Sequence, residues 1–129
     1  MNRRYGKNMR VAVIGLLMLA TKASACGVCI EDTVAVTYDH AVVRQALARH
    51  HVVVFTAIAG DANPGTLARR AKAAAVRAPG VARDSVRAAT APAALSFAVD
   101  PGIAAPETAI AAIERSASGV KLAVLRIVR

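Results

Sequence analysis

The spacing of apolar residues changes along the segment from residue 50 to residue 80, and each change predicts a new element. His50 to Ile58 holds a short apolar run that is typical of a buried strand, and this strand is expected to stop at Gly60. Apolar residues then recur at helical spacing. Asn63 can cap this helix and Pro64 can begin it, because proline lacks the N–H that the first helical turn leaves unpaired.

The same reasoning predicts two strands, a helix and a final strand in the rest of the chain. Asp84–Ala89 and Ala93–Asp100 read as paired strands, a second helix runs from Pro106 to just before Gly119, and Val120–Val128 is the last strand. Bulky and small side chains alternate along the strand before residue 100, and we expect its bulky face to meet the helices. The bulky positions are Leu95, Phe97 and Val99, and the small positions are Ala94, Ser96 and Ala98.

The order strand, helix, strand, strand, helix, strand is that of a ferredoxin-like α+β sandwich, β-α-β-β-α-β, over residues 50–129. Right-handed crossovers would place both helices on one face of a four-stranded antiparallel sheet. An extra N-terminal helix is predicted over Ile30–Arg49, with Glu31 and Asp32 in its first turn. This helix can cover the opposite face, where the small side chains leave room.

The first 25 residues have the pattern of a cleavable signal peptide. Met1–Arg10 is basic, Val11–Ala20 is apolar, and Ala23-Ser24-Ala25 has the small residues that signal peptidase needs. Spanning a bilayer takes about 20 apolar residues, so the shorter run here predicts no stable membrane span. Together with an alanine- and arginine-rich composition, this pattern predicts a periplasmic protein that begins at Cys26. A lipoprotein modified on Cys26 is the less favoured alternative.

Removal of the signal reduces the charge that a partner would meet. The formal net charge of +9 falls to +4, because the signal holds five basic residues and no acid. The densest basic stretch that remains consists of Arg69, Arg70, Lys72, Arg77, Arg83 and Arg87. A solvated helix face accounts for it, and no aromatic residues are interleaved for stacking on bases, so no nucleic-acid partner is expected. Docking to an acidic partner stays open.

The candidate chemistry of the chain lies in Cys26 and Cys29, which have Cys-x-x-Cys spacing. Two thiolates suit Cu(I), whereas an oxidising periplasm favours a disulfide, and lipidation or free thiols are further alternatives. His40 would lie about 16 Å from Cys29 along a continuous helix, too far to share an ion with it. His50 and His51 would point to opposite faces of a strand. No Ser/His/Asp or paired-carboxylate pattern indicates an enzyme.

Three segments resemble a heavy-metal-associated domain of the copper-chaperone type in their order and spacing. They are Pro79-Gly80-Val81, the strand that ends Leu95–Pro101, and Ala109–Glu114 with the strand that follows it. The resemblance covers His50 to Val128, and what it implies is the ferredoxin-like fold.

The chain departs from that family at the usual metal loop. The two metal-binding cysteines of the family would fall near Pro64 and Leu67, and this loop contains no sulfur. The resemblance therefore implies soft-metal handling only if the cysteine pair has moved to Cys26 and Cys29. On that hypothesis the cofactor or cargo is Cu(I), and the partner is a metal donor or acceptor protein. The alternative is a metal-free binding or structural module in which Cys26 and Cys29 form a disulfide, and thiol–disulfide exchange is a third, weaker possibility.

Overall fold

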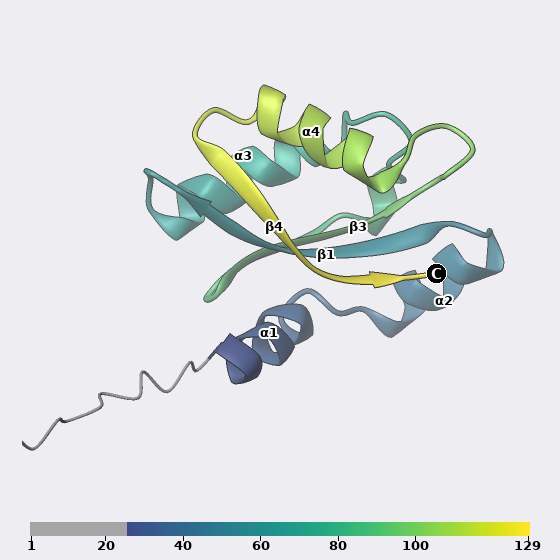
Figure 1. Cartoon of the computed structure of the whole chain (residues 1–129), viewed down its shortest axis with the longest axis horizontal. Coiled ribbons are helices and arrows are strands. Elements are labelled where there is room, and N and C mark those ends of the chain that lie inside the picture. The colour runs from purple at the N-terminus through teal and green to yellow at the C-terminus, as the bar shows by residue number, and fades with distance from the viewer. Residues whose placement is uncertain (1–25) are drawn as a thin grey trace, which may run out of the picture.

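Four strands form one antiparallel sheet in the order β2-β3-β1-β4, with helices on both of its faces (Figure 1). The computed structural model describes residues 26–129, with side chains from Ile30 onward. The elements are α1 (Cys26–Ala35), α2 (His40–Ala48), β1 (Val52–Gly60), α3 (Pro64–Ala75), the 3-10 helix η1 (Arg83–Ser85), β2 (Arg87–Thr90), β3 (Ala93–Val99), α4 (Pro106–Ser116) and β4 (Val120–Val128). This βαββαβ arrangement, preceded by two short helices, confirms the predicted ferredoxin-like fold.

Strand β1 lies inside the sheet and is buried on both of its faces. Val54 is paired with Phe97 of β3 and with Ile127 of β4. Val54 itself belongs to the core under α3 and α4, whereas its neighbours Val53 and Phe55 belong to a second core on the opposite face. Burial on both faces explains why the sequence of this strand reads as a continuous apolar run.

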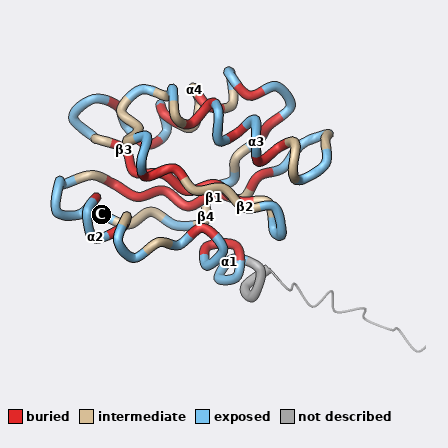
Figure 2. The backbone as a smooth tube through the Cα atoms, turned by 180° about the vertical axis from the view of Figure 1, so that it is seen from behind, coloured by how far each residue is buried: buried red, intermediate tan, exposed pale blue. Residues whose placement is uncertain are grey.

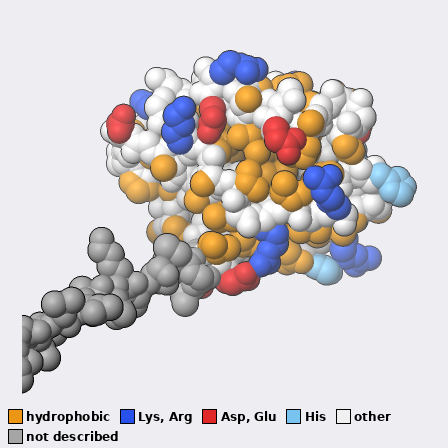
Figure 3. Space-filling view, in the orientation of Figure 1, with side chains coloured by type: hydrophobic (Ala, Val, Ile, Leu, Met, Phe, Trp, Pro, Cys, Tyr) orange, Lys and Arg blue, Asp and Glu red, His pale blue; other side chains and the backbone are white. Residues whose placement is uncertain are grey.

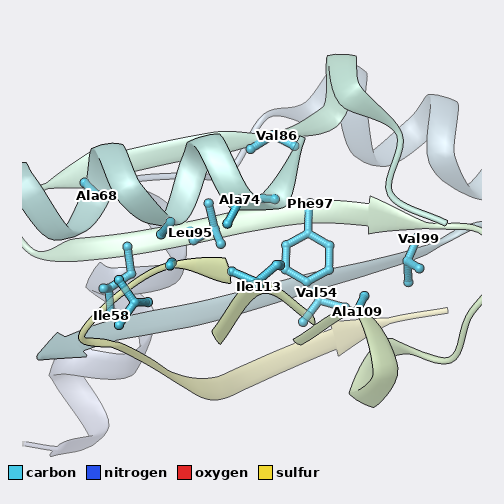
Figure 4. Packing of buried hydrophobic residues seen from close by; sticks show 14 of the residues in the cluster. Val54, Ile58, Ala68, Ala74, Val86, Leu95, Phe97, Val99, Ala109 and Ile113 are labelled. Atoms are coloured by element: carbon cyan, nitrogen blue, oxygen red, sulfur yellow. The ribbon is translucent and has the colours of Figure 1, made fainter. Parts of the chain in front are cut away.

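The larger core lies between the sheet and helices α3 and α4. Leu95, Phe97 and Ile113 are fully buried in it (Figure 4). The bulky side chains of β3 therefore meet the helices, as predicted. The helices contribute mainly alanines, among them Ala71 and Ala109, which are completely buried. Because an alanine buries little apolar area, each of these contacts adds little stability, and the core depends on its few large side chains.

Helices α1 and α2 cover the opposite face of the sheet (Figure 2). Val34 of α1 and Val43 of α2 form a smaller core there with Ala98 of β3. The Ser96 hydroxyl donates a hydrogen bond of 3.1 Å to the carbonyl oxygen of Thr37, in the turn between the two helices. The small side chains of β3 thus leave the room that the N-terminal segment fills, which confirms that part of the prediction.

The prediction of one helix over Ile30–Arg49 is wrong, because α1 ends at Ala35 and α2 begins at His40. Asp39 has an extended backbone and caps α2. Its Oδ1 accepts hydrogen bonds from the N–H groups of Ala41 and Val42 at 3.0 and 3.2 Å. The first turn of a helix leaves several N–H groups without a backbone partner, and Asp39 binds two of them. The helix can therefore stop at Ala35 and a new one begin at His40 without leaving these two groups unpaired.

Strand β1 begins at Val52 and not at His50, because both histidines close helix α2. His50 has a φ of 57°, and its N–H donates to the carbonyl oxygen of Leu47 at 3.0 Å. The N–H of His51 donates to the carbonyl oxygen of Ala46 at 2.8 Å. These two bonds form a Schellman motif, in which His50 takes the left-handed position that glycine usually occupies.

Strand β2 begins at Arg87, three residues later than predicted, because Arg83–Ser85 form η1. The Ser85 hydroxyl donates to the carbonyl oxygen of Ala82 at 2.5 Å and accepts the N–H of Ala98 at 2.8 Å. This side chain therefore takes the place of a backbone partner beside β3, and regular pairing starts only after it.

Candidate functional site

The helix that contains the cysteine pair is docked on the sheet. Helix α1 begins at Cys26 and includes Cys29, and the side chains of both cysteines lie outside the described residues. Further along α1, Val34 is buried against the sheet. Glu31 forms an ion pair with Arg126 of β4. The predicted site therefore starts a helix whose later residues are held on β1, β3 and β4.

The loop between β1 and α3, where the resemblance would place metal ligands, has a structural role in this chain. Asn63 caps α3, since its Oδ1 accepts the N–H of Thr66 at 2.8 Å, and Pro64 is the first helical residue. Leu67 is 4% exposed and belongs to the larger core. A Cβ atom on Gly60 would lie only 2.9 Å from Leu67 Cδ2, so the strand end and the helix are closely packed here. Helix capping and core packing explain these positions.

The three histidines lie in two places. His40 begins α2, and its Nδ1 lies 3.5 Å from the hydroxyl of Tyr38. The predicted distance of about 16 Å between His40 and Cys29 was based on one continuous helix. It does not apply, because the chain breaks between α1 and α2. His50 and His51 do not alternate as strand residues, because they form the end of α2.

His51 also faces an acid that the sequence did not suggest. Its Nε2 lies 3.8 Å from Oδ2 of Asp100. The pairing of Val52 with Val99 accounts for this, because it brings the residue before β1 next to the residue after β3. A hollow of about 230 Å³ beside this pair is lined by Leu47, His50, His51, Val52, Pro101 and Arg129. Only knowledge of the strand register could have revealed this pair.

The basic stretch divides into residues with and without acidic partners. Nη2 of Arg87 lies 3.2 Å from Oδ2 of Asp39, across the sheet face that α2 covers. The backbone N–H of Val42, followed by Arg87 and the N–H of Ala41, holds the pKa of Asp39 below its usual 3.8 against partial desolvation. By contrast, Arg70 donates to a neutral group, the carbonyl oxygen of Ser118, at 3.0 Å.

Apolar side chains gather on the face that α4 and β4 form (Figure 3). Strand β4 is an edge of the sheet, and Val124 is 48% exposed. The register shifts between Phe55 and Thr56, so Leu125 is an extra residue that bulges out of the pairing. Bulges and charged residues such as Lys121 and Arg126 hinder the addition of another strand. This edge therefore has the features of a protected edge.

The part of the chain from Ile30 to Arg129 contains no group of three His, Cys, Asp or Glu side chains arranged to hold a metal ion. Across the described residues, no helix combines the length and the apolar character needed to cross a membrane.

Comparison with protein-family models, with curated proteins and with solved structures finds no match. The fold therefore rests on the structure itself, and the resemblance to heavy-metal-associated domains stays a prediction.

Proposed function

We propose that the protein is exported to the periplasm and binds or passes on Cu(I) through the thiolates of Cys26 and Cys29. The observation that carries this proposal is the Cys-x-x-Cys pair at the start of α1, a helix anchored by Val34 and by the pair of Glu31 with Arg126. Residues three apart lie on the same side of a helix, so both thiolates can approach one ion. The role is binding and transfer, without catalysis, and Cu(I) is the cargo.

The donor chemistry favours a soft ion with few ligands. Structural zinc is almost always bound by four ligands, whereas a pair of thiolates offers only two soft donors, a set that suits Cu(I). A site with only two protein ligands would also suit exchange of the ion with a metal donor or acceptor protein.

The alternative function is a metal-free binding or structural module in which Cys26 and Cys29 form a disulfide. Two observations favour it. First, the oxidising periplasm that the signal-peptide pattern predicts would promote a disulfide between close cysteines. In addition, Pro64 and Leu67 serve helix initiation and core packing at the positions where the resemblance would place ligands.

Native mass spectrometry of the protein purified from the periplasm separates the two functions. The metal proposal predicts a chain that begins at Cys26, holds one copper ion, and has two thiols that react with an alkylating reagent once copper is removed. Cys26→Ser with Cys29→Ser should abolish copper binding. His40→Ala is the matched control: His40 lies at the start of α2, and its replacement should leave copper binding unchanged.

A different result supports the alternative. A mass lower by two hydrogen atoms, with no copper and no alkylation until a reductant is added, would show a disulfide. In that case the double serine variant should lower the melting temperature and have no effect on copper handling.

A further inference from the structure

A hollow of about 320 Å³ lies between α3 and the turn that joins α4 to β4. It is lined by Arg70, Ala73, Ala74, Arg77, Ser116, Ala117 and Ser118. Three of these residues are alanines, whose short side chains keep the space open. The others carry guanidinium or hydroxyl groups, and none is acidic. From this lining we propose that the hollow binds a phosphate-type oxyanion.

Arg70 is already oriented towards this hollow. Its Nη1 donates to the carbonyl oxygen of Ser118 at 3.0 Å, which links α3 to the turn after α4. The carbonyl end of a helix disfavours an anion, and this contact places a positive charge where α4 ends. A guanidinium group has five N–H donors, so Arg70 keeps donors for a ligand after it has bound the carbonyl.

Arg77 and the two serines supply donors that have no other use in the described part of the chain. Arg77 follows the end of α3, is exposed, and makes no side-chain hydrogen bond or ion pair there. The hydroxyls of Ser116 and Ser118 make no hydrogen bond there either. Guanidinium and hydroxyl donors converging from two sides match the several acceptor oxygens of a phosphate group.

The arginines that line this hollow differ from two other arginines of the chain, which are paired with acidic residues. Arg87 is paired with Asp39, and Arg126 with Glu31. In contrast, Lys72 adds positive charge on α3 and Arg115 does so on α4. The nearest acid along α4, Glu114, accepts the N–H of Leu122 at 2.8 Å, which places its carboxylate beside β4 and outside the lining of the hollow. The two arginines that line the hollow, without an acidic side chain in the lining, therefore favour an anionic ligand.

Titration of the mature, 15N-labelled protein with sodium phosphate at constant ionic strength tests the proposal, with sodium chloride as the reference salt. We expect saturable shifts, with an affinity on the order of millimolar, confined to amides around Ala73, Arg77 and Ser116–Gly119. Arg77→Ala should weaken binding about fivefold, because it removes one charge-assisted contact. Arg69→Ala is the matched control, since Arg69 lies on the same helix and outside the lining.

The phosphate group can belong to a free anion or to a lipid headgroup, and a second titration separates these sources. It uses phosphatidylcholine vesicles with and without phosphatidylglycerol. Saturable shifts with inorganic phosphate that weaken in Arg77→Ala support a site for a free anion. Shifts at the same amides with anionic vesicles alone, lost in Arg77→Ala, support a headgroup site. Shifts spread over all basic residues, or equal binding by wild type and Arg77→Ala, would overturn the proposal.

Discussion

His50 shows how a single backbone angle can oppose the preference of a side chain. Its φ of 57° is left-handed, a conformation that costs most L-residues about 1–2 kcal/mol and costs glycine nothing. Histidine is one of the residues that tolerate this region better than most. The position is fixed because the N–H groups of His50 and His51 both bond carbonyls at the end of α2.

Replacing His50 with glycine should therefore stabilise the protein. The relief of strain exceeds the added entropy of the unfolded chain, and we expect a net gain of about 0.5 kcal/mol in the free energy of unfolding. Urea denaturation monitored by circular dichroism measures this change. Arg44→Gly provides the contrast, because Arg44 is exposed in the middle of α2, where glycine should cost about 1 kcal/mol. A loss of stability in His50→Gly would show that the side chain compensates for the strain.

At the scale of elements, the start of α2 depends on one carboxylate that joins two parts of the chain. Asp39 accepts two N–H groups of its own helix and pairs with Arg87 of β2. These contacts keep the pKa of Asp39 below its usual 3.8. The stability that they give is therefore fully present above that pH, and it is lost as the pH falls through the lowered pKa.

Asp39→Asn should separate the charge from the cap, because asparagine also caps helices well. We expect the variant to melt at a lower temperature than the wild type at pH 6, and this difference should shrink at a pH well below 3.8, where the wild-type carboxylate becomes protonated. Arg87→Gln should reduce the same pH dependence, since it removes the partner. Thermal melts at both pH values measure these effects. A difference between Asp39→Asn and wild type that stays constant with pH would contradict a role for the charge.

The elements themselves were predictable to different degrees from the sequence. Helices α3 and α4 begin with proline and bury one face, so their starts and periods could be read directly. The break before α2 had a local signal in Asp39, a good capping residue. The apolar residues, however, recur at helical spacing on both sides of this break, and this pattern favoured the prediction of one continuous helix. The contact of Arg70 with Ser118 joins residues 48 positions apart, and only the packing of α3 against the end of α4 creates it.

At the scale of the whole molecule, the described residues form a sheet between two helical layers, and the two layers rest on cores of different size. Helices α3 and α4 cover the large core, whereas α1 and α2 rest on a small one around Val53, Phe55 and Ala98. The need for this second layer could be inferred from the small residues of β3. The proposed cysteine site was visible from spacing alone, and its relation to the fold depends on how firmly the second layer is docked.

Ala98→Leu tests that docking. Ala98 is 2% exposed between β3 and the N-terminal helices, and a larger side chain there should cost about 1–3 kcal/mol and push α1 and α2 outward. Amide hydrogen exchange should then accelerate more at Val34 and Val43 than at Leu95 and Ile113 in the other core. Ala123→Leu is the control, because Ala123 is exposed on β4 and the change should alter stability by less than about 0.5 kcal/mol.

Uniform acceleration of exchange in both cores of Ala98→Leu would mean that the two layers unfold as one unit. Faster exchange confined to α1 and α2 would mean that the helix with Cys26 and Cys29 can detach while the sheet stays folded, which would allow its thiolates to move towards a partner protein.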